Sequence, residues 1–514
     1  MTDRTLAALL FAGAALISGI TILQGIQVND EGLMLQAAAR VAGGQVPYRD
    51  FWWFYPPGQP YLLGFLWQVF GPSLLTWRIL RVLCDAAVAT LAWALARRGG
   101  ASQPVAIGTW LAAALAMAYP TGPHPFPLTL ALCLGSLLLM DRRPVLAGGL
   151  AGVAALWRIE FAAYLGLGVL LAHAIRPVPR RDQAEAAALF AGAALAVAIV
   201  LYAPVVAAAG LGDSFDLLIR YPVQDFAHYQ SLPFPVSYDG VLNTSSIGGF
   251  FDDSAESLLL FYLPLVLMIG LAGAVAALGL RFTRERWWQV ATGVFAIGMA
   301  HYLVTRPDVF HTAPLAVMVA VLAAWALAER GEEARGGVLK AAAVVVAAFA
   351  VGYALIEGLD RRWLELRADR AELRLPVADG VRVAKREREP LERAVNWVRA
   401  HTRPREPIYV ATKRSDLVTS GAPILYVLAD RPNPTRYDIA APGVITSAPV
   451  QDEIVSDLEA NRVRTVIRWT DPLSAAREPN RAGESTGVTI LDAYLASNYR
   501  RVARYGDYVL LRRR

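Results

Sequence analysis

Two adjacent carboxylates, Asp30 and Glu31, lie just past the first apolar stretch of the chain, Leu6 to Gln24, which is long enough to cross a membrane. Charged side chains are costly next to hydrocarbon, so acidic residues at a membrane boundary indicate a water-facing site. A carboxylate in a partly desolvated pocket can accept a proton from a hydroxyl group near neutral pH. The alternative is that Asp30 and Glu31 simply begin a solvated loop. The Tyr-Arg-Asp-Phe and Pro-Pro-Gly sequences that follow closely favour a functional site.

The composition indicates a membrane protein with many spans. Of 514 residues, 55% are hydrophobic and 18% are charged, and the mean hydropathy is +0.39. A soluble enzyme has roughly 25% charged residues. The net charge of +6 does not indicate nucleic acid as a partner, because the basic residues are scattered between apolar segments. The two cysteines, Cys84 and Cys133, have no metal-ligand spacing.

Apolar segments near the length that a bilayer requires recur along the chain and predict roughly eleven spans. The segment from Gln59 to Phe70 is apolar but short, and it predicts a re-entrant or interfacial piece. The predicted spans are residues 5–25, 74–96, 103–119, 126–140, 144–158, 160–175, 184–208, 257–279, 288–305, 312–328 and 338–357.

Basic residues in the short loops predict the orientation. With the N-terminus in the cytoplasm, the arginine-rich loops fall inside, and the segment from Asp30 to Pro57 falls outside together with Arg158 and the Arg306 to His311 segment. We expect a multi-pass protein of a bacterial cell membrane. An odd number of spans also places the C-terminal part outside, on the side of the carboxylates.

The composition changes after about residue 358, where charged residues become dense and spanning segments stop. Residues 390–402, 450–460 and 489–497 have patterns typical of helices, and residues 407–412, 463–469 and 508–512 have patterns typical of strands. The predicted fold class is therefore mainly α: a helical membrane core, residues 1–357, a charged linker or helix, residues 358–388, and a small extracytoplasmic α/β domain, residues 389–514.

The first outer segment resembles a known family. Its features are Asp30-Glu31-Gly32, Gly43-Gly44, then Pro47 to Phe51 and Tyr55-Pro56-Pro57-Gly58, followed by Phe70-Gly71 and Arg78. This arrangement is similar to the first outer loop of GT-C membrane glycosyltransferases, which include protein O-mannosyltransferase-like and aminoarabinose-transferase-like enzymes. Arg306-Pro307-Asp308 and His311 resemble a late outer loop of the same superfamily. The resemblance covers the membrane core.

The resemblance implies transfer of a sugar from a polyprenyl-phosphate carrier on the outer face. Asp30 is then the candidate catalytic base, and Glu31 the residue that orients Asp30 or the acceptor. The expected partners are a polyprenyl-phosphate-sugar donor, a lipid, glycan or protein acceptor, and membrane lipids, with no nucleic acid. Because two neighbouring carboxylates hinder each other's ionisation, we also expect a cation beside them.

The leaving phosphate needs positive charge, and guanidinium groups match its geometry. The candidate donor-binding residues are Arg49, Arg158, Arg306, His311 and Tyr55, with Arg220 as a further cation on the same side. Arg49 could equally form a local ion pair with its neighbour Asp50, and Arg158 could pair with Glu160. Trp52 to Tyr55 are read first as an interfacial aromatic belt, with a wall against the donor as the functional alternative.

The second outer loop, residues 119–125, departs from the family pattern because it contains His124 but no carboxylate. A divalent metal is therefore possible but unsupported, and the sequence gives no good case for an obligatory metal and identifies no certain cofactor. Asp252-Asp253 could bind a metal, but a helix cap is the favoured role. Two other functions remain as alternatives: a transporter or flippase, against which the absence of an internal repeat counts, and a non-catalytic scaffold of the cell envelope.

Overall fold

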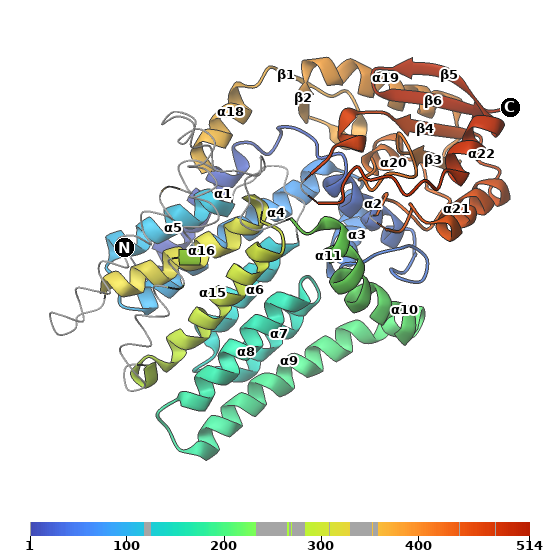
Figure 1. Cartoon of the computed structure of the whole chain (residues 1–514). Helices are drawn as coiled ribbons and strands as arrows, with labels where there is room; N and C mark the ends of the chain where they lie inside the picture. The colour runs from blue at the N-terminus through green and yellow to red at the C-terminus, as the bar shows by residue number, and fades with distance from the viewer. Residues whose placement is uncertain are drawn as a thin grey trace, which may run out of the picture.

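The computed structural model describes residues 2–117, 125–232, 265–266, 269, 283–307, 309–328, 352, 358–441, 443–478 and 480–514. Helices form an elongated body, and a small sheet with its own helices lies at one end of that body, next to α2, α3 and α11 (Figure 1). The predicted mainly helical class with a C-terminal sheet is confirmed.

The helices of the body match most of the predicted apolar segments closely. The predicted pieces 257–279 and 338–357 lie almost entirely outside the described residues. The elements up to residue 328 are α1 (Asp3–Gly19), α2 (Asp30–Ala42), α3 (Gly58–Phe70), α4 (Leu74–Arg98), α5 (Gln103–Met117), α6 (Phe126–Leu139), α7 (Pro144–Ala155), α8 (Ile159–Ile175), α9 (Arg180–Ala209), α10 (Leu211–Phe215), the π-helix η1 (Asp216–Phe226), α11 (Ala227–Gln230), α15 (Trp287–Thr305) and α16 (Val309–Ala328).

The predicted count of about eleven spans is not confirmed. In the part of the chain that the structure describes, three helical segments are long and apolar enough to cross a membrane: Leu74–Arg98, Arg180–Ala209 and His311–Ala328. Four further apolar helices, α5 to α8, have 12 to 17 residues. The shortest of them, α7, has 12 residues, which cover about 18 Å at 1.5 Å per residue, less than the roughly 30 Å of a hydrocarbon core.

Small residues bring helices of the body into close contact. A methyl group on Gly148 of α7 would meet the carbonyl oxygen of Phe190 in α9 at 2.1 Å, and one on Gly152 would meet that of Ala194 at 2.5 Å. Glycine at these two positions lets the backbones of α7 and α9 approach each other, as is common between membrane helices.

The C-terminal sheet has four strands in the order β3-β4-β6-β5, with β3 parallel to β4 and the other neighbours antiparallel. A separate antiparallel pair, β1 and β2, precedes it. The predicted helices and strands are all present, whereas α20, β1, β2 and β5 were not predicted. The elements are α18 (Arg361–Arg367), β1 (Arg370–Glu372), β2 (Arg382–Ala384), α19 (Lys385–His401), β3 (Ile408–Ala411), α20 (Ile424–Ala429), α21 (Ala448–Ala460), β4 (Thr465–Trp469), α22 (Ile490–Asn498), β5 (Tyr499–Tyr505) and β6 (Tyr508–Arg513), with 3-10 turns at Pro376–Ala378 and Pro472–Ala475.

Helix α2 was not predicted, and it joins the body to the C-terminal part. A Cβ on Gly32 would lie 2.2 Å from the backbone nitrogen of Ile424, so the start of α2 lies directly against α20. One hydrophobic core contains residues of α2, such as Leu33, together with Leu425 of α20 and Val466 of β4. The predicted boundary at residue 389 therefore crosses a continuous apolar core, and the first outer segment packs as part of the C-terminal unit.

Candidate functional site

Asp30 is the first residue of α2, and its side chain is exposed. The side-chain amide of Asn29 donates to its Oδ1 at 3.0 Å. A carboxylate in the first turn of a helix interacts favourably with the positive end of the helix dipole. The structure thus places Asp30 at an accessible helix end, where it can meet a second molecule.

Glu31 lies on the buried side of the same turn and has no exposed surface. Nε and Nη2 of Arg78 donate to its two carboxylate oxygens at 2.7 and 2.9 Å, and the backbone amide of Gln27 donates to Oε2 at 3.3 Å. Arg78 also donates to the carbonyls of Ile22 and Gly25. The expected cation beside the carboxylates is therefore Arg78, which had not been singled out for this role. The geometry favours Glu31 as the residue that fixes α2 on α4, and a direct chemical role for it stays a prediction.

Tyr55 lies where several predicted site residues meet. The pKa of Tyr55 is raised to about 12, chiefly by burial; the negative charge of Asp30 contributes to this rise, and the positive charges of Arg158 and Arg306 oppose it. The three charged side chains that sequence reasoning selected therefore act on one hydroxyl group. At neutral pH this hydroxyl keeps its proton and can donate a hydrogen bond.

Arg158 sits at the break between α7 and α8, with a side chain that is 12% exposed. Its Nε lies 2.8 Å from Oε1 of Glu160, so the structure contains the local ion pair that the sequence offered as one alternative. The guanidinium also lies 6.0 Å from the ring centre of Tyr55 and 4.9 Å from that of Tyr302. The local pair and a position beside Tyr55 are thus compatible.

Arg306 directly follows α15, and His311 lies in the first turn of α16. The ring centres of His311 and Tyr302 are 4.4 Å apart, so His311 is joined to Arg158 through Tyr302. Nη1 of Arg306 donates to the backbone and side-chain oxygens of Gln230 at 2.7 and 2.9 Å. We call Asp30, Tyr55, Arg158, Arg306 and His311, with the ring of Tyr302, the Tyr55 cluster.

Arg49 shows no contact with the Tyr55 cluster in the described part of the chain. Its Nε and Nη2 donate to the carboxylate of Asp50 at 2.9 and 2.8 Å. This pairing lowers the pKa of Asp50, whose Oδ2 also accepts from the amide of Val46. Of the two roles considered for Arg49, the structure contains the local ion pair. Arg220 likewise pairs locally, with Asp216 and Asp225.

The aromatic residues before Tyr55 do not form the interfacial belt that was the first interpretation. Trp52, Trp53 and Phe54 are at most 8% exposed. Trp52 meets Tyr221 edge to face at 4.8 Å, and Phe54 packs on Phe226 at 5.2 Å. The segment from Leu211 to Gln230 is helical, and its η1 part covers these rings. Trp52, Trp53 and Phe54 are therefore core residues, and the rings of Trp53 and Phe54 pack against that of Tyr55.

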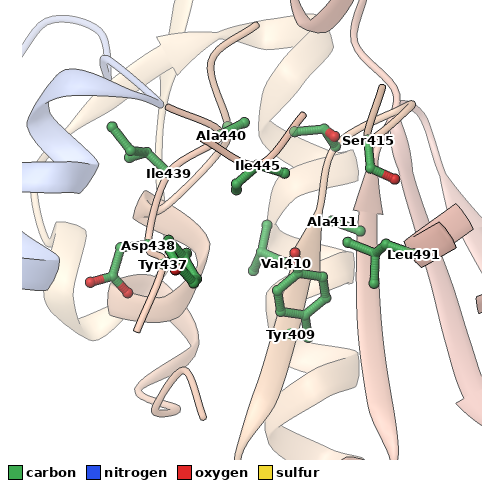
Figure 2. A pocket seen from close by; sticks show the side chains of 12 residues that line it. Tyr409, Val410, Ala411, Ser415, Tyr437, Asp438, Ile439, Ala440, Ile445 and Leu491 are labelled. Carbon is green, nitrogen blue, oxygen red and sulfur yellow. The ribbon is translucent and has the colours of Figure 1, made fainter. Parts of the chain in front are cut away.

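A small cavity lies elsewhere, between the end of β3 and the 437–445 segment (Figure 2). Its volume of about 10 Å³ suits a single water molecule, and Tyr409, Ser415 and Asp438 are among its polar lining residues. It is too small for a sugar or a phosphate. Within the described ranges, no three His, Cys, Asp or Glu side chains come together as a metal site, while His124 and Asp252-Asp253 lie outside those ranges.

The chain was compared with known proteins. No family model and no curated protein matches its sequence. Among solved structures, ArnT from Cupriavidus metallidurans bound to undecaprenyl phosphate is 14% identical and aligns with a TM-score of 0.56 over 99% of this chain and 98% of that chain. The apo state of the same protein gives 16% identity and a TM-score of 0.54 over the same shares. At these identities the likeness is one of fold, and at that level it confirms the resemblance noted in the sequence.

Proposed function

We propose that the chain is an integral membrane glycosyltransferase, with a sugar on a polyprenyl phosphate as donor and a hydroxyl group as acceptor. The observation that carries this proposal is the Tyr55 cluster. Arg158 lies beside the rings of Tyr55 and Tyr302, His311 lies against Tyr302, and the charges of Asp30 and Arg306 act on the Tyr55 hydroxyl. The match of the fold over 99% of the chain to a protein solved with undecaprenyl phosphate supports the class of donor.

The chemistry assigns a role to each group of the cluster. Asp30 accepts the proton of the acceptor hydroxyl while that oxygen attacks the anomeric carbon of the sugar. The bond between the anomeric carbon and the phosphate oxygen breaks, and the electron pair leaves with the polyprenyl phosphate. Arg158 and Arg306 stabilise the charge that develops on this phosphate, and the protonated Tyr55 can donate to it. His311 is placed to bond to the phosphate or to a sugar hydroxyl.

The proposed reaction takes place on the outer face of a cell membrane, with the N-terminus in the cytoplasm. Residues 1–357 form the catalytic core in this proposal, and the C-terminal unit lies outside with the Tyr55 cluster. A reporter that is active only outside the cytoplasm, fused to the C-terminus, should then be active. An inactive outer reporter together with an active cytoplasmic one would reject this orientation.

Asp30→Asn tests the base directly. General base catalysis contributes about 10²- to 10⁴-fold, so we expect loss of sugar transfer by about that factor, with unchanged expression and unchanged binding of the donor lipid. The matched control is Asp182→Asn, which changes another exposed aspartate in the first turn of a helix and should keep full activity. Mass spectrometry of envelope glycans with and without the chain identifies the transferred sugar. Full transfer by Asp30→Asn would remove Asp30 from the mechanism.

A further inference from the structure

A loop of the C-terminal unit reaches the Tyr55 cluster. Oε2 of Glu478, in the segment between β4 and α22, accepts from Nη2 of Arg306 at 3.3 Å. The side-chain amide of Asn480 donates to the same oxygen at 2.9 Å and to the carbonyl of Gln230 at 3.3 Å. The C-terminal unit therefore contributes a carboxylate directly beside a proposed phosphate ligand.

Arg306 is held on both terminal nitrogens. Gln230 of α11 accepts from Nη1 with two oxygens, and Glu478 accepts from Nη2. The side chain is 23% exposed, so a guanidinium on a long flexible stem would otherwise sample many conformations. Two partners on two nitrogens fix the plane of the guanidinium before a ligand arrives, and such preorganisation reduces the cost of binding.

The loop that carries Glu478 is itself docked. The ring of Tyr229 lies under the guanidinium of Arg481 at 5.5 Å, and Arg481 also contacts His228. The unit behind the loop is attached to α2 through the buried pair of Arg40 and Asp438, with Nε and Oδ2 2.6 Å apart. Since α2 begins with Asp30, a continuous set of packed elements connects the base to Glu478 and so to Arg306.

We propose that Glu478 is a positioning residue, supplied by the C-terminal unit, that orients Arg306 for the phosphate group of the donor lipid. This inference rests on the proposed function. Glu478 acts through Arg306 and does not touch the reacting atoms. Its carboxylate also repels a phosphate, but it is 37% exposed and water screens this repulsion, so the ordering of the guanidinium is the larger effect.

The test measures binding of undecaprenyl phosphate to the full chain in lipid nanodiscs. Glu478→Ala should weaken binding by about fivefold, the upper range for a partly exposed ion pair. Glu478→Gln keeps an oxygen acceptor for Nη2 and should stay within about twofold of wild type by the same estimate. In turnover assays Glu478→Ala should raise the KM for the donor lipid and leave kcat unchanged. The control is Glu389→Ala, which removes an exposed pair with Arg393 in α19.

A second arm uses the Arg306→Ala background. Because Glu478 acts through Arg306, Glu478→Ala should have no further effect on binding there. Unchanged or tighter binding by Glu478→Ala alone, an equal loss in both backgrounds, or an equal loss with Glu478→Gln would each overturn the inference. A wild-type chain that does not bind undecaprenyl phosphate would overturn the proposed function itself, so the two failures are distinguishable.

Discussion

Removal of the Glu31 side chain should loosen α2 far more than it changes any exposed part of the chain. Glu31 and Arg78 have 0% and 1% exposed side chains and share two hydrogen bonds. Breaking a buried ion pair by removing one partner costs about 3–5 kcal/mol, because the other charge stays buried. In Glu31→Ala, Arg78 keeps its hydrogen bonds to the carbonyl oxygens of Ile22 and Gly25, so the lower end of this range applies.

Hydrogen exchange followed by mass spectrometry measures this loosening locally. With about 1.36 kcal/mol per factor of ten, a loss of about 3 kcal/mol speeds exchange of the α2 amides by about two orders of magnitude. Peptides from α9 serve as the internal reference, because in the described part of the chain the hydrogen bonds and the ion pair of Glu31 go to Gln27 and Arg78, outside that helix. Glu31→Gln keeps two of the acceptor contacts without the charge and should give an intermediate increase.

An increase of less than tenfold in α2 exchange would refute the assignment of Glu31 as the residue that fixes this helix. A variant that keeps the exchange pattern of wild type and yet loses sugar transfer would be a different failure. It would support a role of Glu31 in the chemistry, such as the orientation of Asp30 or of the acceptor that the sequence analysis had proposed.

Three other perturbations test the junctions that hold the site. Asp438→Asn leaves the guanidinium of Arg40 buried without an anion and should lower the free energy of unfolding by about 3–5 kcal/mol. The C-terminal unit should then be digested faster by a protease. An unchanged rate of digestion would argue against the Arg40–Asp438 pair as the junction between α2 and the C-terminal unit. Gly32→Ala places a methyl group 2.2 Å from a backbone nitrogen of α20 and should therefore lower the thermal stability. Gly166→Ala is the control, because a methyl group there meets open space. Equal effects of the two changes would contradict the close contact between α2 and α20. The folded-state pKa of Asp50 lies below its ordinary value of 3.8, so the stabilisation that Asp50 gives is present above that pH and is lost as the pH falls through the folded pKa. The stability difference between wild type and Asp50→Asn should therefore shrink below about pH 4, and a difference that is constant down to pH 3 would contradict it.

The sequence was sufficient for elements whose signal is local. Long apolar segments predicted α4, α9 and α16, and alternating patterns predicted β3 and β4. In each case the pattern of apolar residues within the segment itself indicates which side chains are buried. The edge strand β5 was missed, since its sequence Tyr-Arg-Arg-Val-Ala-Arg-Tyr has exposed arginines in place of apolar residues. Charged residues are typical of protected sheet edges, so the same side chains that suit the edge conceal the strand.

Helix α2 shows why the rest could not be predicted. Its sequence contains Glu31, Gln36 and Arg40, which a local pattern assigns to a solvated segment, and all three are buried in the structure. Their partners are remote: Arg78 lies 47 positions from Glu31, and Asp438 lies 398 positions from Arg40. A buried charge is tolerated only with its partner, and no window of sequence contains both.

The site shows the same division between local and remote information. The orientation rules predicted that Arg158, Arg306 and His311 lie on one side of the membrane. In the structure, Arg158 and His311 lie beside Tyr302, and the charges of Arg158 and Arg306 both act on Tyr55. Glu478 has no local signal, because its role exists only through a contact with Arg306 across 172 positions.

The position of Asp30 follows from the opposite faces of α2. One face is joined to α4 through Glu31 and Arg78, and the other is joined to the C-terminal unit through Gln36, Arg40 and Asp438. A helix with polar contacts on two sides cannot rotate or slide without breaking buried charge pairs, each of which costs several kcal/mol. Asp30 stands at the free end of this fixed helix, so its carboxylate is exposed while its backbone is held. In the proposed mechanism, the base must meet a mobile acceptor at a defined distance from the phosphate of the donor, which requires that combination. The buried polar groups around this exposed aspartate therefore fit the role that we propose for it.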